Sequence, residues 1–382
     1  MRILVVSKFY PPVIGGVETT VLELCENFVR KGHDCQVVVM DPERRGMERL
    51  NGVGVHRFPV DTRLLAGLNR HVFLHLARDL QRSRYDIVQI HNFHILLSLQ
   101  TAILCRLRGV PYVFSAHYHG KGHTPIRNLL FNAYKMVGGL GLSGSARVTT
   151  GSNFERSKLL HDFPALTKKT VVISPGIRVR ELPDLERRKD TLLYVGRLMR
   201  YKGVDHVLEA MRSLKDARNL VHLRIVGTGP EEAILQKRAS DLGLAEQITW
   251  LGDVSDRELT NEYATASCLI LLSAAEAYGL VVAEALSCGT PCIVADMEAL
   301  SEFLQEPGCF GVSYPPDPEK VARTILQVLR SPPITAGPFS DKITTWPGCA
   351  DKYLELFELV VGESASAKRR PKSDSRPENP AP

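Results

Sequence analysis

Two glutamates, Glu276 and Glu284, stand eight positions apart in a segment that follows an apolar run. A glycine and then an apolar, helix-forming pattern predict a helix that begins near Leu280. Eight helical residues would separate the carboxylates by about 12 Å, whereas glycosidase acid–base pairs lie roughly 5–9.5 Å apart. We therefore expect them to hold two ends of one elongated ligand, with Glu276 deep in a cleft and Glu284 binding a ribose diol. The alternative for Glu284 is a solvent-facing helical carboxylate.

Two cations follow another strand-like run. Arg197 comes directly after the turn glycine Gly196, and Lys202 precedes a second glycine and a helical pattern. A cation at a strand end and a cation at a helix start can converge, together with the positive end of that helix, on a diphosphate. The alternative is that each is an ordinary solvated surface charge.

Glycine-rich turns open two further helical patterns. Gly15 and Gly16 follow the first strand-like run, where backbone N–H groups could approach an anion at a helix N-terminus. Gly227 lies in a Gly-Thr-Gly-Pro turn after a later strand. Neither turn has the G-x-G-x-x-G or the Walker pattern. A purely structural turn is therefore the alternative for both.

Histidines gather after two strand-like runs of the first half. His117 follows the run at residues 112–115, and the other members of the group are His91, His94, His119 and His123. No carboxylate accompanies them, so a metal site is the weaker interpretation. We expect His117 to contact a polar ligand, and the role of the other four histidines stays open.

The segments that position these side chains are short apolar runs that alternate with helical patterns, which predicts parallel sheets covered by helices on both faces. The expected strands lie at 3–6, 36–40, 87–90, 112–115, 147–150 and 170–173, and at 192–195, 221–226, 248–251, 268–272, 292–295 and 311–314. We predict an α/β protein with two Rossmann-like, doubly wound domains, residues 1–176 and 191–341, that face each other across a cleft. Residues 177–190 are the predicted linker and 362–382 a disordered tail.

Composition agrees with two soluble domains. The chain has 382 residues, of which 44% are hydrophobic and 24% charged. These values exclude a chain that is disordered, collagen-like or coiled-coil throughout. No purely apolar run reaches the roughly 18 residues of a membrane-spanning helix.

The formal charge of +6 is unevenly distributed: residues 1–188 carry +12 and the remainder −6. A basic half could meet anionic lipid or phosphorylated substrates, whereas nucleic acid is the weakest partner because no zinc-finger or RNP-like motif is present. The stretch from Leu64 to Arg84 has apolar residues at helical spacing among arginines. It predicts peripheral contact with an anionic membrane, and the alternative is an ordinary core-facing helix.

The eight cysteines occur singly, without a C-x-x-C pair, which favours reduced thiols in the protein core. The first residues form a strand-like run rather than the apolar core of a signal peptide. We therefore expect a cytoplasmic protein, placed at the inner face of the plasma membrane if the membrane contact holds.

Together these features resemble the retaining glycosyltransferases of the GT-B fold, sequence family 4, also described as glycosyl transferases group 1, from Met1 to about Val361. The most specific motif is E-x7-E, here Glu276 to Glu284. The resemblance implies transfer of a hexose-type sugar, with retention of anomeric configuration, from a nucleotide sugar to a lipid-linked or glycan acceptor. It implies a UDP-sugar rather than a GDP-sugar and no metal cofactor. It also implies that a last helix, residues 342–361, returns to the N-terminal domain, which would bind the acceptor.

Residue roles carry over by position. The implied catalytic residues are His117, Glu276, Arg197 and Lys202, and the implied donor-binding residues are Gly15, Gly16, Gly196, Gly227, Gly279, Leu280 and Glu284. This chain departs from the family at residues 296–300, Asp-Met-Glu-Ala-Leu, where relatives often have a Gly-Gly turn, and at Tyr118, where an aspartate is common after the histidine.

Two other functions fit the same features. A nucleotide-sugar 2-epimerase shares the two-domain architecture and the donor chemistry, and it should convert donor without an acceptor. A catalytically silent nucleotide-sugar-binding protein should do no chemistry with any acceptor.

Overall fold

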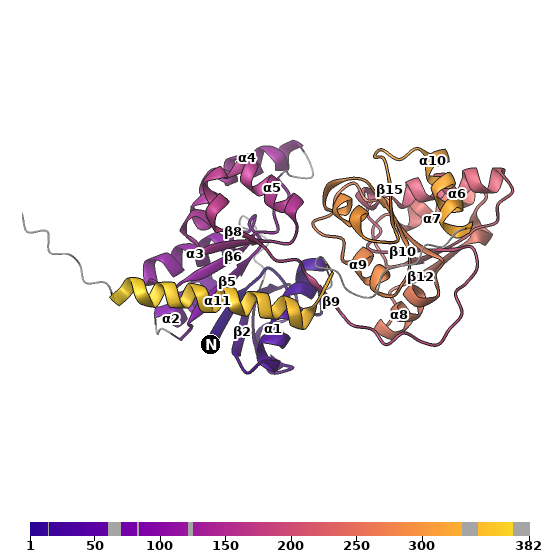
Figure 1. Ribbon diagram of the computed structural model, residues 1–382. Coiled ribbons are helices and arrows are strands. Elements are labelled where there is room, and N and C mark those ends of the chain that lie inside the picture. Colours follow the sequence, from indigo (N-terminus) through magenta and orange to yellow (C-terminus); the bar gives the residue numbers. More distant parts are fainter. Residues whose placement is uncertain (14, 60–69, 82–83, 121–124, 331–342, 370–382) are drawn as a thin grey trace, which may run out of the picture.

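The computed structural model describes all residues except 14, 60–69, 82–83, 121–124, 331–342 and 370–382. Figure 1 shows two α/β domains side by side, each built on a sheet with helices on both faces. The α/β class and the two doubly wound sheets predicted from the sequence are confirmed.

The first domain has an eight-stranded sheet in the order β3-β4-β2-β1-β5-β6-β7-β8, and only the β3–β4 pair is antiparallel. Its strands are β1 (Arg2–Val6), β2 (Asp34–Asp41), β3 (Gly46–Leu50), β4 (Val53–Pro59), β5 (Ile87–His91), β6 (Tyr112–Ser115), β7 (Arg147–Thr150) and β8 (Thr170–Val172). The sequence does not predict β3 or β4. The edge strand β3 is largely exposed and lacks an apolar run, so nothing separates it from a loop.

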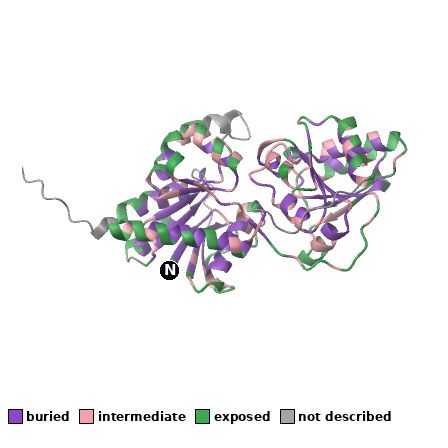
Figure 2. Ribbon diagram, viewed as in Figure 1, coloured by how far each residue is buried: buried purple, intermediate pink, exposed green. Residues whose placement is uncertain are grey.

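Both faces of this sheet are covered, which explains why β1 is apolar at successive positions. Ile3 and Val5 belong to one hydrophobic core, and Leu4 and Val6 to another. The first core includes residues of α1 (Gly16–Arg30) and α11 (Trp346–Arg369), and the second includes residues of α2 (Arg70–Gln81), α3 (Leu96–Arg108), α4 (Pro125–Gly144), α5 (Asn153–Asp162) and η2 (Pro164–Lys169). Figure 2 shows the buried strands between the partly exposed helices.

The stretch proposed for membrane contact is a core helix over its described part. Val72, Leu76 and Leu80 of α2 are buried against the first domain's sheet. The prediction that they face a membrane is wrong, because the same helical spacing serves core packing. Leu64, Leu65 and Leu68 lie outside the described residues.

The second domain has a six-stranded parallel sheet in the order β12-β11-β10-β13-β14-β15. Its strands are β10 (Thr191–Val195), β11 (His222–Val226), β12 (Ile248–Gly252), β13 (Cys268–Leu271), β14 (Cys292–Ala295) and β15 (Cys309–Val312). Its helices are η3 (Arg200–Lys202), α6 (Val204–Asp216), α7 (Glu232–Asp241), η4 (Ala245–Gln247), α8 (Asp256–Thr265), α9 (Leu280–Ser287), η5 (Glu298–Gln305) and α10 (Pro318–Arg330).

The chain crosses between the domains twice, and the two crossings pair as the short strands β9 (Gly176–Ile177) and β16 (Thr344–Thr345). After β16, α11 packs on α1 in the first domain (Figure 1). The prediction of a disordered tail is wrong for residues 362–369, because α11 continues to Arg369 and its Glu363 pairs with Arg147 at 2.7 Å. The remaining tail residues lie outside the described part.

All eight cysteines are buried and free of disulfide bonds. None of the helices in the described part combines the length and apolarity that a membrane crossing needs.

Candidate active site

The turn after β10 is held to the end of β11 and the turn after it by backbone hydrogen bonds. The Gly196 N–H donates to the Val226 carbonyl at 3.0 Å, and the Leu198 N–H donates to the Thr228 carbonyl at 2.9 Å. A Cβ atom on Gly227 would lie 2.3 Å from the Gly196 carbonyl oxygen. Close backbone packing therefore explains why position 227 is glycine, and a donor contact there stays a prediction.

Lys202 and Glu276 form an ion pair in the second domain, with Nζ 2.6 Å from Oε1. Both side chains are mostly buried. Gly203, at φ +72°, brings the Lys202 turn close to the end of β13, since a Cβ there would lie only 2.0 Å from the Leu272 carbonyl oxygen. The structure thus brings together two of the predicted catalytic residues, and each already has an opposite charge beside it.

Arg197 is exposed at the carboxyl end of β10, and its guanidinium donates to the sulfur of Met199 at 4.0 Å. Over the described residues it has no carboxylate partner. It is therefore a cation available to an anion. Gly279 begins α9 at φ +104°, where a Cβ would come within 2.8 Å of Leu300. The first N–H groups of α9, including that of Leu280, point toward the helix N-terminus, where they can meet an anion.

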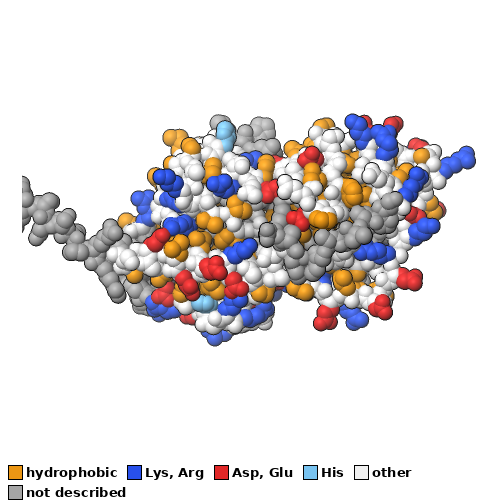
Figure 3. Space-filling view, in the orientation of Figure 1, with side chains coloured by type: hydrophobic (Ala, Val, Ile, Leu, Met, Phe, Trp, Pro, Cys, Tyr) orange, Lys and Arg blue, Asp and Glu red, His pale blue; other side chains and the backbone are white. Residues whose placement is uncertain are grey.

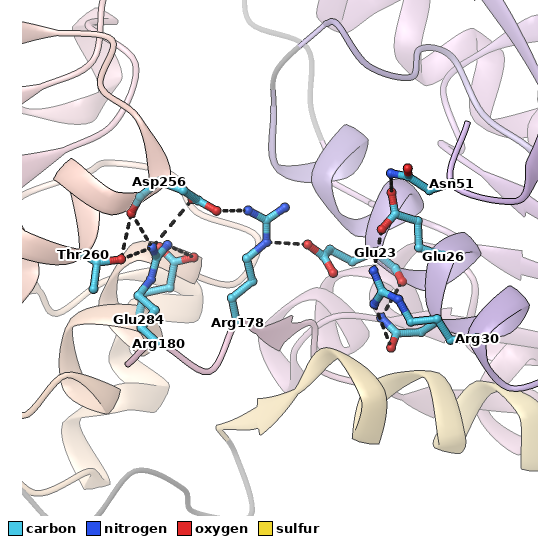
Figure 4. Close-up of polar contacts among 10 residues, drawn as sticks. Glu23, Glu26, Arg30, Asn51, Arg178, Arg180, Asp256, Thr260 and Glu284 are labelled. Carbon is cyan, nitrogen blue, oxygen red and sulfur yellow. Dashed lines mark hydrogen bonds and ion pairs between the residues drawn. The ribbon is translucent and has the colours of Figure 1, made fainter. Parts of the chain in front are cut away.

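Glu284 lies on the second turn of α9 between two partners that the sequence does not reveal. Tyr263 donates its hydroxyl to Oε2 at 2.7 Å. Nη2 of Arg180 lies 3.5 Å from Oε1 (Figure 4). Burial raises the pKa of Glu284, while Arg180 and the Tyr263 hydroxyl lower it. The alternative of a solvent-facing carboxylate is wrong, because the side chain is only 18% exposed.

Two arginines of the linker, Arg178 and Arg180, form polar contacts that join the surroundings of Glu284 to the first domain. Arg178, two residues before Arg180, lies between Glu23 of α1, at 2.5 Å, and Asp256 of α8 (Figure 4). Arg180 donates to the Thr260 hydroxyl at 2.8 Å. The two arginines border a cavity of about 310 Å³ between the linker and α8. The linker is therefore packed on the second domain rather than free.

His117 follows β6 with the unusual φ of +46°, and its Nε2 lies 3.0 Å from Nδ1 of His91. Burial lowers the pKa of His117 to about 3 and that of His91 well below its usual value. Both rings are therefore neutral at neutral pH. The rings of His94 and His119 lie 6.2 Å apart, and His123 lies outside the described residues.

Glu155 of α5 holds the His117 turn. Its carboxylate is buried and accepts hydrogen bonds from the N–H groups of Tyr118 and Gly151, both at 2.7 Å. Burial raises the pKa of Glu155 to about 7. Sequence reasoning missed this residue, and the signal available was the S-x-x-E spacing from Ser152 to Glu155.

The same helix start contacts the second domain beside Glu276. Ser152, the N-cap of α5, donates its hydroxyl to the Ala277 carbonyl at 2.8 Å. Lys158 pairs with Glu298 at 2.8 Å, and the Glu298 carboxylate also accepts the Glu276 N–H at 3.2 Å. The backbone of Glu298 has the unusual φ of +53°. The histidine pair and the Lys202–Glu276 pair are thus joined through α5.

Gly15 and Gly16 lie at the start of α1, as predicted. A Cβ on Gly15 would lie 2.3 Å from a carboxylate oxygen of Glu18, whereas one on Gly16 would meet nothing within 4 Å. The Glu18 carboxylate therefore occupies the helix start, and an incoming phosphate would have to move it.

Two family models match consecutive parts of the chain. Glycosyltransferase Family 4 matches residues 14–181, and Glycosyl transferases group 1 matches residues 180–342. Their matches together span most of the chain. The protein is a group 1 glycosyltransferase.

This group 1 glycosyltransferase is 25% identical over 360 aligned positions to an uncharacterized glycosyltransferase of Methanocaldococcus jannaschii, covering 86% of this chain and 89% of the relative. It is 24% identical over 395 positions to the alpha-monoglucosyldiacylglycerol synthase of Acholeplasma laidlawii, covering 94% and 96%. The crystal structure of Anabaena HepE in complex with UDP-glucose superposes with a TM-score of 0.67 at 16% identity, covering 96% and 99%. These likenesses establish the GT-B fold.

No three His, Cys, Asp or Glu side chains of the glycosyltransferase's described residues are grouped so that they could hold a metal ion. Several ionisable groups of the site instead form pairs: Lys202 with Glu276, Lys158 with Glu298 and His117 with His91.

Replacing Glu155 with alanine should lower kcat of the glycosyltransferase by about tenfold, because the His117 turn loses its anchor and small misplacements of reacting groups are costly. Affinity for UDP, measured by calorimetry, should be unchanged, since most of the predicted donor-binding residues lie in the other domain. Glu355→Ala, at an exposed position of α11, is the control. An equal loss of UDP affinity would indicate general damage to the fold.

Proposed function

We propose that this glycosyltransferase moves a hexose-type sugar from a UDP-sugar to a lipid-linked or glycan acceptor, with retention of anomeric configuration. The observation that carries the proposal is the contact network through α5. It links His117, at the carboxyl end of β6, to Glu276, which pairs with Lys202. Polar groups of the two domains thus converge at the ends of parallel strands, where such folds bind ligands.

The proposed donor lies on the second domain. Arg197 and Lys202 bind its diphosphate, together with the amides of Gly279 and Leu280. An ammonium group has three N–H donors, so Lys202 can bind a phosphate while it keeps its bond to Glu276. The leaving nucleoside diphosphate gains negative charge, and these fixed positive groups stabilise it in the transition state.

The remaining residues bind the sugar and the nucleoside. The Glu276 oxygen that is not bonded to Lys202 accepts hydrogen bonds from sugar hydroxyls, and Glu284 accepts those of the ribose. His117, neutral at neutral pH, contacts the sugar near the reacting carbon. Attack from the same face as the departing diphosphate gives retention without an enzyme nucleophile.

The nature of donor and acceptor is supported by relatives. The HepE structure contains UDP-glucose, and the name of the Acholeplasma laidlawii relative specifies a glucosylated diacylglycerol. The basic first domain, with +12 over residues 1–188, suits an acceptor on an anionic membrane. We place the reaction on the cytoplasmic side, where nucleotide sugars are supplied and the eight thiols stay reduced.

A donor screen tests the function. Purified protein is incubated with UDP- and GDP-sugars, with and without lipid extract, and released nucleoside diphosphate is measured. Release that depends on the extract, with a product whose anomeric configuration by NMR matches the donor, supports the proposal. Conversion of donor without acceptor would indicate an epimerase, and binding without any conversion would indicate a silent binding protein.

Turnover should survive excess EDTA. Arg197, Lys202 and the α9 amides supply the positive charge that a divalent cation provides in other transferases. The measurement compares initial rates with EDTA, with added Mg²⁺ and with neither. Loss of activity in EDTA that Mg²⁺ restores would overturn this assignment of charge stabilisation.

A further inference from the structure

Helices α3 and α4 expose apolar side chains on their outer side. Ile103 and Leu107 of α3 stand one turn apart, as do Met136 and Leu140 of α4, with Val137 beside them. These five residues, here called the α3–α4 surface, are between 43% and 83% exposed. They form one side of two helices that lie side by side, since a Cβ on Gly141 would contact Ala102 at 3.4 Å.

Core packing does not account for this surface. The inward sides of the same helices supply buried residues such as Leu97, Ala102 and Leu142 to the hydrophobic core. The exposed apolar side chains lie on the opposite, outer side of these helices and do not belong to that core. Adjacent exposed apolar groups on one face are typical of surfaces that bind another protein or a membrane.

The charge around the α3–α4 surface has one sign. From Ile87 to Phe154 the chain has no aspartate or glutamate over 68 residues. Lys135 and Arg147 have carboxylate partners from other elements, Asp162 and Glu363. That leaves other cations of this region for an external anion.

Three cations near the surface lack a carboxylate partner within the described part of the chain: Arg106, Arg108 and Lys169. Arg106 donates to the Leu140 carbonyl at 3.5 Å, and Lys169 donates to the Ser143 carbonyl at the end of α4 at 2.6 Å. Burial and the nearby Arg147 and Arg106 lower the pKa of Lys169. Cations are therefore crowded at the end of the apolar surface.

Figure 3 agrees with this distribution. Acidic side chains gather low on the left of the view, over α11 and α1. The coloured side chains over α4 are mostly hydrophobic or basic. The α11 and α1 side of the first domain is thus acidic, whereas the α4 side is apolar and basic.

We propose that the α3–α4 surface docks on a membrane that contains anionic lipids, with the apolar side chains among the lipid headgroups and the cations at the phosphates. The proposal deepens the proposed function and rests on it for the acceptor, but it moves the membrane contact from α2 to α3 and α4. A second copy of the chain fits this surface less well, because a two-fold contact would bring the same unpaired cations together.

The test is co-sedimentation with vesicles, without donor or acceptor. Vesicles of phosphatidylglycerol and phosphatidylcholine should bind the protein at low salt, and vesicles of phosphatidylcholine alone should bind it far less. High salt should weaken the binding. Failure to bind the anionic vesicles at low salt would overturn the proposal.

Matched variants locate the contact. The double variant Leu107→Glu/Met136→Glu should lower the bound fraction by about tenfold or more, because it places charge among the lipid headgroups. Arg106→Gln/Arg108→Gln should remove most of the preference for anionic lipid. The control is Ile234→Glu on α7, an exposed apolar residue of the second domain, which should bind as the wild type does. Equal binding by the α3–α4 variants, or equal loss in the control, would contradict the assignment.

A failure of docking can be told from a failure of the proposed function. UDP affinity and donor turnover in solution should be the same in the surface variants and the wild type. Vesicle binding that needs the surface, in a protein that transfers no sugar, would leave docking intact and refute the function. Light scattering checks the second-copy alternative: a dimer that the double variant abolishes would overturn membrane docking.

Discussion

Arg197→Ala and Lys202→Ala should each lower kcat by about 10²–10³-fold, the usual effect of removing one group that stabilises charge in the transition state. Arg197 has no carboxylate partner within the described residues, so its removal leaves no buried charge behind. Its effect should therefore appear in kcat and hardly at all in the unfolding temperature.

Lys202 needs a more careful experiment, because its removal leaves the carboxylate of Glu276 mostly buried without its counter-ion. An uncompensated buried charge destabilises a fold by several kcal/mol. The double variant Lys202→Met/Glu276→Gln removes both charges and should be more stable than Lys202→Met alone, yet no more active.

Arg200→Ala is the matched control, since Arg200 is an exposed cation of the same short helix η3. Its kcat should stay near that of the wild type. If Arg200→Ala is as inactive as Arg197→Ala, or if Arg197→Ala keeps full kcat, then the diphosphate is not bound where we propose.

The sequence predicts most of the fold because the central strands of both sheets are buried on both faces. β10, for example, is buried at all five positions from Thr191 to Val195, and such continuous runs are recognisable without knowledge of neighbours. β3 fails the same criterion, because its stability comes from pairing with β4 and not from an apolar pattern. The apolar residues Val72, Leu76 and Leu80 of α2 show a different limit of sequence-based prediction. Their helical spacing alone does not tell whether they face the protein core or a membrane.

Some residues of the candidate site are likewise predictable from the sequence, and others are not. Lys202, Glu276 and Glu284 are found from the sequence because each lies in a short motif next to a strand end or a helix start. Their partners are not found. Tyr263 and Arg180 reach Glu284 from 21 and 104 positions away in the chain, so only the folded structure brings them together.

Glu284→Ala should weaken UDP binding by roughly tenfold to 100-fold, because a ribose diol that loses its acceptor costs roughly 1–3 kcal/mol. Isothermal calorimetry measures the change. Lys202 and Arg197 remain in place, so uridine should lose about the same factor as UDP. Unchanged affinity in a folded variant would refute the assignment of Glu284 to the ribose.

The pH dependence of UDP binding gives a second measurement of the same group. Glu284 must be ionised to accept both hydroxyls, and burial raises its pKa above the ordinary value. The affinity should therefore fall as the pH is lowered, beginning at a higher pH than for an exposed glutamate. The charged and titratable groups that act on it are Arg180, Tyr263, Asp256 and Cys288.

Tyr263→Phe separates the pKa from the contact itself. The variant keeps the ring and removes the hydroxyl that donates to Oε2 at 2.7 Å. Since that hydrogen bond lowers the pKa of Glu284, its loss should move the fall in UDP affinity to higher pH. Leu182→Ala, at an exposed position of the same linker, should leave the midpoint where it is. A midpoint that moves equally in both variants would mean that linker packing, rather than the hydrogen bond to Glu284, controls the titration.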